Sequence, residues 1–241
     1  MLYTSKDNKK IKELKKLQSK KYRDLTSRFI VEGEHLVEEA FKNSCLDEVY
    51  ILENTNISIN VPINYVSKEI LKYISNLETP TIIGLCHKQK ETSIGKKIVI
   101  LEDIQDPGNL GTIIRSCVAF NIDTLILSKN TVDLYNEKVL RATQGMIFKI
   151  NIIVKDTLEI VKELKQQDYH IYGTKVDGGK ELKTIEKNDK FAIIMGNEGR
   201  GITKDIEKLC DTYLYIKMNK SCESLNVGVA TSIILYELDR W

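Results

Sequence analysis

Residues 97–115, KIVILEDIQDPGNLGTIIR, decide the fold class of the second half of the chain. The apolar run Lys97–Leu101 predicts a short buried strand, and Leu110–Phe120 has the apolar spacing of a helix. Between them a Pro-Gly pair turns the chain, Asn109 is a candidate N-cap, and Gly111 permits close approach of another backbone segment. A strand that turns directly into a helix is the repeating unit of an α/β sheet.

The same alternation continues to the C-terminus. Short apolar strands that alternate with helices predict a parallel sheet covered by helices on both faces, so the fold class is α/β. The further predicted strands are 124–127, 148–154, 169–173, 191–195 and 213–216, and the predicted helices are 136–143, 157–166, 203–209 and 226–238.

The first 24 residues are strongly basic, with nine Lys or Arg against three Asp or Glu. Ile11, Leu14 and Leu17 recur at three-residue spacing, which predicts an amphipathic helix with Ser5 as its cap. Because the whole chain carries a net charge of only +2, this basic end belongs to a near-neutral body. It indicates a polyanionic partner, and a solvated lysine-rich helix is the open alternative.

Residues 25–87 contain predicted helices near 34–41 and 67–75 and predicted strands at 48–52 and 81–86. Residues 88–96 are polar and without periodicity, which is typical of a linker. We therefore expect a basic helix over residues 1–24, a small α/β domain over 25–87, a linker over 88–96 and the parallel-sheet domain over 97–241.

The composition argues against several classes of protein. Apolar residues make up 42% of the chain, yet no run approaches the roughly 18 residues of a membrane helix, and no signal peptide is evident. The five cysteines form no CxxC pair and lie in apolar stretches, which predicts reduced, buried thiols in a cytoplasmic protein. With three dispersed histidines, no metal site is expected.

Two further segments have the features of ligand loops. Gly196–Gly201 (GNEGRG) follows a predicted strand, where open α/β sheets bind their ligands, although a plain surface loop would look the same. Ser224–Ala230 (SLNVGVA) precedes the last helix, with Ser224 and Asn226 as possible caps. The chain lacks the G-x-G-x-x-G of a dinucleotide fold, which argues against a dehydrogenase.

Taken together, Asn109…Arg115, Gly196–Gly199 and Ser224–Val227 resemble motifs 1, 2 and 3 of the SpoU (TrmH) class of RNA 2′-O-ribose methyltransferases in the SPOUT superfamily. The resemblance covers about residues 96–241. Residues 20–23 and 29–37 are similar to the substrate-binding domain of that family, a small fold like ribosomal protein L30e. Where the family often has Pro-Gln-Gly before the linker, this chain has Pro80-Thr81-Ile82.

The resemblance implies an α/β fold with a trefoil knot in the C-terminal domain, and a homodimer. It also implies S-adenosylmethionine as the cofactor, held largely by backbone groups, with the loop after Gly173 closing over it. The expected cofactor-binding residues are Thr174, Gly196, Asn197, Gly199, Ile216 and Leu225.

For catalysis, the resemblance gives Arg115 the central role. Because a guanidinium stays protonated in proteins, we expect it to clamp a phosphate and stabilise the developing ribose alkoxide rather than act as a base. The other expected catalytic residues, which would orient Arg115 and the nucleotide, are Asn109, Glu198, Ser224 and Asn226.

The expected partner is RNA, with ribosomal RNA (23S) favoured over transfer RNA because of the separate N-terminal domain. A tRNA methyltransferase of the same class and a non-catalytic RNA-binding protein with this fold are the alternatives. The residues expected to contact RNA are Lys9, Lys16, Lys20, Lys21 and Arg23.

Overall fold

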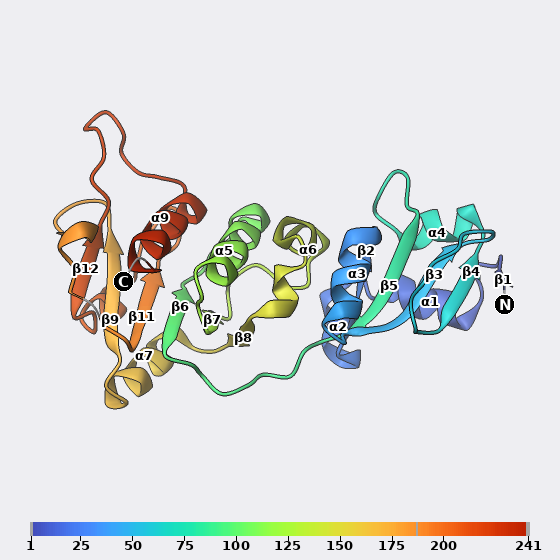
Figure 1. The fold of residues 1–241 in the computed structure, drawn as a ribbon, viewed down its shortest axis with the longest axis horizontal. Coiled ribbons are helices and arrows are strands. Elements are labelled where there is room, and N and C mark those ends of the chain that lie inside the picture. The colour runs from blue at the N-terminus through green and yellow to red at the C-terminus, as the bar shows by residue number, and fades with distance from the viewer. Residues whose placement is uncertain (1, 187, 240–241) are drawn as a thin grey trace. The chain divides into compact units, whose positions relative to one another are not determined.

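The computed structural model describes residues 2–186 and 188–239, which form two compact units (Figure 1). Unit 1 contains the residues up to Lys90 together with Asp133–Lys149, and unit 2 contains Glu91–Val132 and the residues from Ile150 onward. The sequence-based boundaries place residues 133–149 in the C-terminal domain, whereas in the structure this segment groups with unit 1. Each unit is described by itself.

Unit 1 contains a mixed five-stranded sheet in the order β1-β4-β3-β5-β2. Strands β2 and β3 pair with β5 in antiparallel fashion, and β4 lies parallel to β3 and β1. The strands are β1 Leu2–Tyr3, β2 Arg28–Glu32, β3 Leu46–Leu52, β4 Ile63–Val66 and β5 Ile82–His87. The helices are α1 Lys9–Lys16, α2 Lys20–Thr26, α3 Glu34–Lys42, α4 Lys68–Ile74, α6 Glu137–Thr143 and the 3-10 helix η1 Met146–Lys149.

The basic N-terminal segment is an integral part of unit 1. It forms two helices rather than one, and Asn8, not Ser5, caps α1 by accepting a hydrogen bond from the Lys10 N–H at 2.9 Å. Ile11 and Leu14 are buried in one core cluster with residues of α4, β3 and β5. The segment that carries the positive charge therefore also supplies apolar residues to the core, and its removal would expose that core.

Segment 133–149 packs against β2 and α3 within unit 1. The ring of Tyr135 lies 4.5 Å from that of Phe29, and the Lys149 ammonium lies 2.8 Å from the Glu39 carboxylate. Glu39 is 6% exposed, so the ion pair is largely removed from solvent on the carboxylate side. These contacts explain why a segment with helical spacing in the second half of the sequence belongs to the first unit.

Unit 2 contains an all-parallel sheet of seven strands in the order β10-β12-β9-β11-β6-β7-β8. This confirms the predicted fold class, while the trefoil knot stays a prediction. The strands are β6 Lys97–Leu101, β7 Thr124–Leu127, β8 Asn151–Val154, β9 His170–Lys175, β10 Lys180–Glu181, β11 Phe191–Met195 and β12 Thr212–Tyr215. The helices are α5 Pro107–Ala119, α7 Thr157–Gln166, α8 Lys204–Glu207, α9 Val227–Asp239 and the 3-10 helix η2 Leu182–Thr184.

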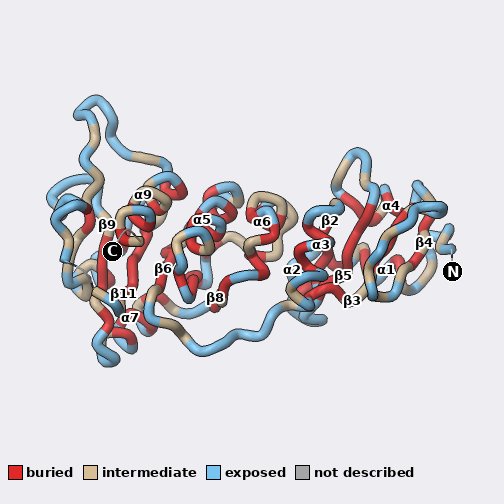
Figure 2. The backbone as a smooth tube through the Cα atoms, in the orientation of Figure 1, coloured by how far each residue is buried: buried red, intermediate tan, exposed pale blue. Residues whose placement is uncertain are grey.

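Helices cover both faces of this sheet, whose central strands β6, β7 and β11 are buried, whereas the edge strand β10 is exposed (Figure 2). Helices α7 and α8 pack on the face formed by residues such as Ile98, Ile100 and Ile194. Helices α5 and α9 contact each other, with a hydrogen bond of 2.7 Å between the hydroxyls of Ser116 and Ser232. This arrangement leaves the ends of the central strands open, and the loops that follow β6, β11 and β12 carry the three motifs.

Among the helices that the structure describes, none is long and apolar enough to cross a membrane. All five cysteines are free thiols. The prediction that they are buried is confirmed for Cys45, Cys86 and Cys117 and is wrong for Cys222, which is exposed in the loop before α9. Cys210 is intermediate, and burial raises its thiol pKa to about 11.

Candidate active site

The loop after β11 begins the site. Gly196 lies directly against the other end of the loop, because a Cβ at this position would come within 2.3 Å of the carbonyl carbon of Gly201. Paired main-chain hydrogen bonds between Asn197 and Gly201, at 2.9 and 3.1 Å, close the loop. Gly201 has a φ of +69°, a region that favours glycine. These two glycines therefore permit a tight loop at the carboxyl end of the central strand.

Helix α5 brings the first motif to this loop. Its N-cap is Asp106, not Asn109, because the Asp106 carboxylate accepts from the Asn109 N–H at 2.7 Å. Pro107 then occupies the first turn, where its missing N–H is harmless. The helix thus begins three residues earlier than its apolar spacing predicts, and the Asn109 side chain is free for another role.

Three motif residues form one chain of hydrogen bonds. The Asn226 side-chain amide donates to Asn109 Oδ1 at 2.7 Å, and the Asn109 amide donates to Glu198 Oε1 at 3.1 Å. The Asn226 oxygen accepts from the N–H groups of Gly228 and Val229, so Asn226 also caps α9, as predicted. One residue from each motif is therefore joined to the next, and Glu198 provides a carboxylate at the end of the chain.

The other predicted catalytic residues are not part of this chain of bonds. Ser224 is exposed and lines the neighbouring cleft, and within the described residues its hydroxyl has no hydrogen-bond partner. Arg115 is exposed on α5 and, within the same residues, its guanidinium has neither an ion pair nor a hydrogen bond. Arg115 also lies outside the lining of the cleft, and within the described residues it makes no ion pair with Glu198.

A cleft of about 820 Å³ lies beside the hydrogen-bonded chain in unit 2. Its volume is in the range of small-molecule and cofactor sites. Its walls come from β9, the loop after β11, the segment after β12 and the start of α9. All six predicted cofactor-binding residues line it, namely Thr174, Gly196, Asn197, Gly199, Ile216 and Leu225.

The lining fits S-adenosylmethionine. Among the described residues, the main-chain groups of Ile216 and Leu225 have no internal hydrogen-bond partner, so both are available to a ligand. The side chains of Ile216, Met218 and Leu225 offer apolar contact for a flat base. Side-chain polar groups contribute less, because the Thr174 hydroxyl donates to the Ile194 carbonyl at 3.0 Å.

Asn197 lines the cleft but uses its side chain within the protein. Its amide nitrogen donates to the Asp103 carbonyl at 2.8 Å, and its oxygen accepts from the N–H groups of Gly199 and Arg200. Asp103 was not singled out from the sequence. The signal that could have indicated it is an acidic residue, tolerant of a left-handed backbone, directly after a buried strand that leads into the first motif.

The predicted RNA-contacting residues lie on α1 and α2. Lys9, Lys16, Lys20 and Lys21 are all exposed. Arg23 is a correction, because it is only 7% exposed and its guanidinium donates to the Leu17 and Gln18 carbonyls and to the Asp133 carboxylate. It is a structural residue of unit 1.

Fold and site together define a class of protein. An all-parallel sheet with three loop motifs around one cofactor-sized cleft is the architecture of a SPOUT methyltransferase. Residues 96–236 match the SpoU rRNA methylase family, and residues 8–84 match the MRM3-like substrate-binding domain. The chain belongs to the SpoU rRNA methylase family and is an S-adenosylmethionine-dependent RNA methyltransferase.

Individual relatives are similar to this chain over nearly its whole length. It is 36% identical over 238 residues to the 23S rRNA (guanosine(2553)-2′-O)-methyltransferase RlmP of Bacillus subtilis, with 96% of each chain covered. It is also similar to an rRNA methyltransferase from Sinorhizobium meliloti, with a TM-score of 0.88, 26% identity and coverage of 100% of this chain and 97% of that one. A second structure of that rRNA methyltransferase, with AdoMet bound, has a TM-score of 0.87 and the same identity and coverage.

Proposed function

We propose that this protein transfers the methyl group of S-adenosylmethionine to a ribose 2′-hydroxyl of 23S ribosomal RNA. The observation that carries the proposal is the chain Asn226–Asn109–Glu198, which joins all three motifs at the rim of the cofactor-sized cleft. The 23S target is supported by the activity for which the Bacillus subtilis relative is named and by the match of residues 8–84 to a substrate-binding domain.

S-adenosylmethionine supplies an electrophilic methyl group. The 2′-hydroxyl is a weak nucleophile until it loses its proton, so the site must orient it and stabilise the developing oxyanion. Asn109 and Asn226 hold Glu198 at the rim, where its carboxylate can orient the nucleotide and balance a nearby cation. The guanidinium of Arg115 remains protonated and is available to a phosphate beside the reacting ribose.

We further propose that the active protein is a homodimer in which a second copy supplies Arg115. Arg115 is exposed and lies outside the cleft of its own chain. Val229 and Tyr236, on the neighbouring helix α9, are 46% and 49% exposed, which leaves apolar surface beside it. Light scattering should give about twice the 27.6 kDa of one chain, and a monomer at micromolar concentration would contradict the proposal.

Comparison of RNA from cells with and without the gene tests the target. Mapping of 2′-O-methyl sites should show one site in 23S rRNA that disappears with the gene and returns with wild-type protein but not with Arg115→Ala. Loss of a site in tRNA alone would favour the tRNA enzyme. Unchanged methylation in both RNAs would favour a non-catalytic RNA-binding protein.

A further inference from the structure

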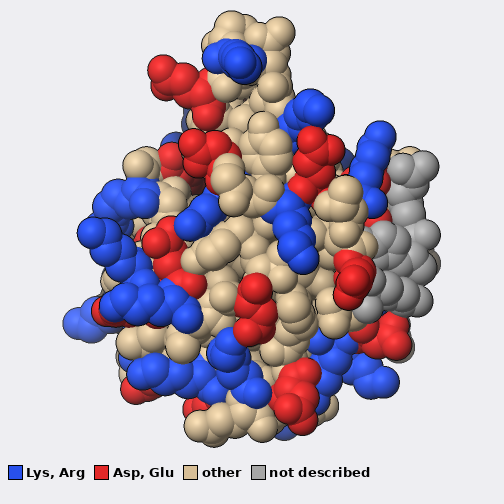
Figure 3. All heavy atoms as spheres, turned by 90° about the vertical axis from the view of Figure 1, so that its left-hand side faces the viewer, with Lys and Arg blue, Asp and Glu red and all other residues tan. Residues whose placement is uncertain are grey.

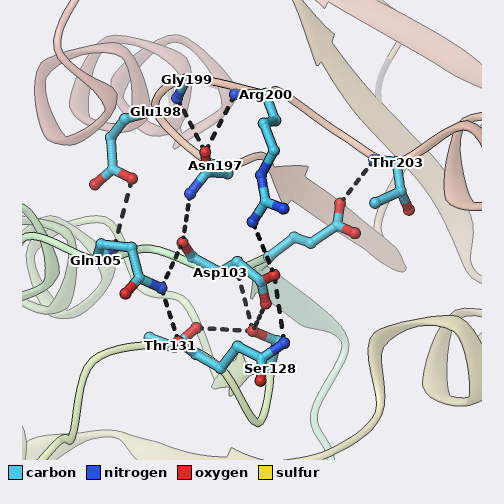
Figure 4. A network of polar contacts seen from close by, with 11 residues as sticks. Asp103, Gln105, Ser128, Thr131, Asn197, Glu198, Gly199, Arg200 and Thr203 are labelled. Atoms are coloured by element: carbon cyan, nitrogen blue, oxygen red, sulfur yellow. Dashed lines mark hydrogen bonds and ion pairs between the residues drawn. The ribbon is translucent and has the colours of Figure 1, made fainter.

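The loop Gly196–Gly201 is tied to the two residues that follow strand β6. Figure 4 shows Asp103 at the centre of a polar network that reaches this loop on one side and the segment after β7 on the other. Glu102, which is 6% exposed, accepts from the Thr203 N–H at 3.1 Å just beyond the far end of the loop. The loop that lines the cofactor cleft is therefore held near both of its ends by residues outside it.

Asp103 has an unusual backbone conformation that its side chain stabilises. Its φ is +57°, in the left-handed region, which Asp and Asn tolerate better than most residues. The Ser128 hydroxyl donates to Asp103 Oδ1 at 2.7 Å, and the Asp103 N–H lies 2.9 Å from the same hydroxyl oxygen, which accepts from it. Thr131 lies 3.0 Å from that hydroxyl and completes its surroundings. The two hydrogen bonds between Asp103 and Ser128 fix the direction of the Asp103 carbonyl.

That carbonyl sets the position of Asn197. It accepts from the Asn197 side-chain amide at 2.8 Å, and the Asn197 oxygen in turn accepts from the Gly199 N–H at 3.0 Å and the Arg200 N–H at 3.1 Å. The Arg200 guanidinium, on an exposed side chain, makes a longer contact of 3.5 Å with Asp103 Oδ2. A connected path thus runs from Ser128 through Asp103 and Asn197 to the backbone of the loop.

We propose that Asp103 is a positioning residue for cofactor binding, which acts through Ser128 and Asn197 to fix the shape of the loop Gly196–Gly201. The inference rests on the assignment of the cleft to S-adenosylmethionine. Asp103 lies outside the cleft lining and touches no reacting atom, so its effect on the cofactor is indirect. Because the loop residues Gly196–Gly201 all line the cleft, a small change in loop shape changes the shape of the cleft wall that faces the cofactor.

The test compares S-adenosylhomocysteine affinity by calorimetry in wild type, Asp103→Ala and Asp103→Asn. Alanine removes the acceptor for Ser128 and is disfavoured at this φ, so we expect binding weaker on the order of tenfold. Asparagine keeps an acceptor oxygen and tolerates the left-handed conformation, so it should stay within about twofold of wild type. RNA affinity, measured separately, should be unchanged in both variants.

Asp168→Ala is the matched control. Asp168 also has a left-handed backbone, with φ of +62°, but is exposed and lies between α7 and β9, away from the cleft lining. Its replacement introduces the same backbone strain and should lower the melting temperature without weakening S-adenosylhomocysteine binding. Folded Asp103→Ala protein with wild-type affinity, or an equal loss of affinity in Asp168→Ala, would overturn the positioning role. Failure of the wild type itself to bind would overturn the cofactor assignment as well.

Discussion

Arg115 is the residue on which the proposed chemistry depends most. It is exposed and, among the described residues, unpaired, so its guanidinium contributes little to the stability of the chain that carries it. The cofactor cleft is lined by residues of other elements and not by Arg115. Arg115 and the cleft residues can therefore have separate roles. A residue that acts on RNA and not on the cofactor should change turnover without changing cofactor binding.

Arg115→Ala should leave the melting temperature and S-adenosylhomocysteine affinity nearly unchanged and should almost abolish methyl transfer. Arg115→Lys keeps the charge but loses the forked pair of donors, so it should restore little activity. Calorimetric titration and tritiated methyl transfer measure the two properties separately. Wild-type turnover in Arg115→Ala, or loss of cofactor binding in the folded variant, would contradict this role.

The sequence predicts only in part which residues of the three motifs contact one another. The order Asn109, Glu198, Asn226 indicated one site, and the structure joins these three side chains. The bonding roles of Asp103 and Asn197 could not be predicted, because they depend on a left-handed φ and on strand ends that meet only in the folded sheet.

Among the elements of unit 1, helices α1 and α2 carry most of the N-terminal positive charge. The apolar residues of α1 belong to the core of unit 1, whereas Leu25 of α2 is 75% exposed, and Lys9, Lys20 and Lys21 face solvent. On the face of the protein seen in Figure 3, Lys and Arg are interspersed with Asp and Glu among the residues drawn in colour. A concentrated basic surface is therefore expected from α1 and α2 rather than from that face. Substitution of single lysines tests this surface better than truncation, because truncation would expose the core of unit 1.

Replacing Lys9, Lys20 and Lys21 with Gln should weaken RNA binding and leave cofactor affinity unchanged. If these lysines meet phosphates, the slope of log affinity against log salt should flatten by about 0.7–0.9 per lost contact. Replacement of the exposed Lys68, Lys72 and Lys138 of unit 1 changes the net charge equally and is the control. Equal slopes for the two triple variants would mean that α1 and α2 are only solvated surface.

Glu39 anchors the segment 133–149 within unit 1. Hydrogen bonds from Lys149 and Lys42 lower its pKa and outweigh the opposing effect of burial. A carboxylate whose pKa is lowered by folding stabilises the fold at pH values above its pKa in the unfolded chain, which is about 4.3. This stabilisation is lost as the pH falls through the pKa of the folded state.

Glu39→Gln should therefore lower the free energy of unfolding at pH 7 by about 1–2 kcal/mol, with a smaller difference as the pH falls below about 4.3. Urea unfolding between pH 7 and pH 3 measures this difference. Glu38→Gln is the control, because Glu38 is exposed and lies 3.8 Å from Lys42. The same loss of stability at both ends of the pH range would show that the Glu39 charge is not responsible.

Strand and helix positions in unit 2 followed from apolar periodicity, and β6, β7, β11 and α7 have the predicted bounds. The two-residue strands β1 and β10 were missed, because two residues show no periodicity. The single predicted N-terminal helix is two helices, because α1 ends at Lys16 and Ser19, in an extended conformation, begins α2 after a turn that spacing alone does not reveal. The grouping of segment 133–149 depends on tertiary packing.

At the scale of the whole molecule, the proposed dimer predicts complementation between two inactive variants. Gly199→Trp should fill the cleft, because Gly199 lines it and a Cβ at this position would meet only Asn197 Oδ1, at 3.7 Å. Mixed with Arg115→Ala, it should form some dimers with one intact cleft and one intact Arg115 on different copies. Random mixing makes about half of the dimers mixed, and each mixed dimer has one working site out of two. The most activity that the mixture can recover is therefore about a quarter of the wild-type value. No recovery from a mixture of folded dimers would mean that Arg115 serves its own chain.

We propose that the cofactor bound in this cleft delivers its methyl group to a ribose hydroxyl of ribosomal RNA. The most direct measurement incubates purified protein with tritiated S-adenosylmethionine and 23S rRNA from cells lacking the gene, followed by complete digestion to nucleosides. The label should be recovered in one 2′-O-methylated nucleoside and should be absent with Gly199→Trp. Label on a base, or no label above the Gly199→Trp background, would contradict the proposal.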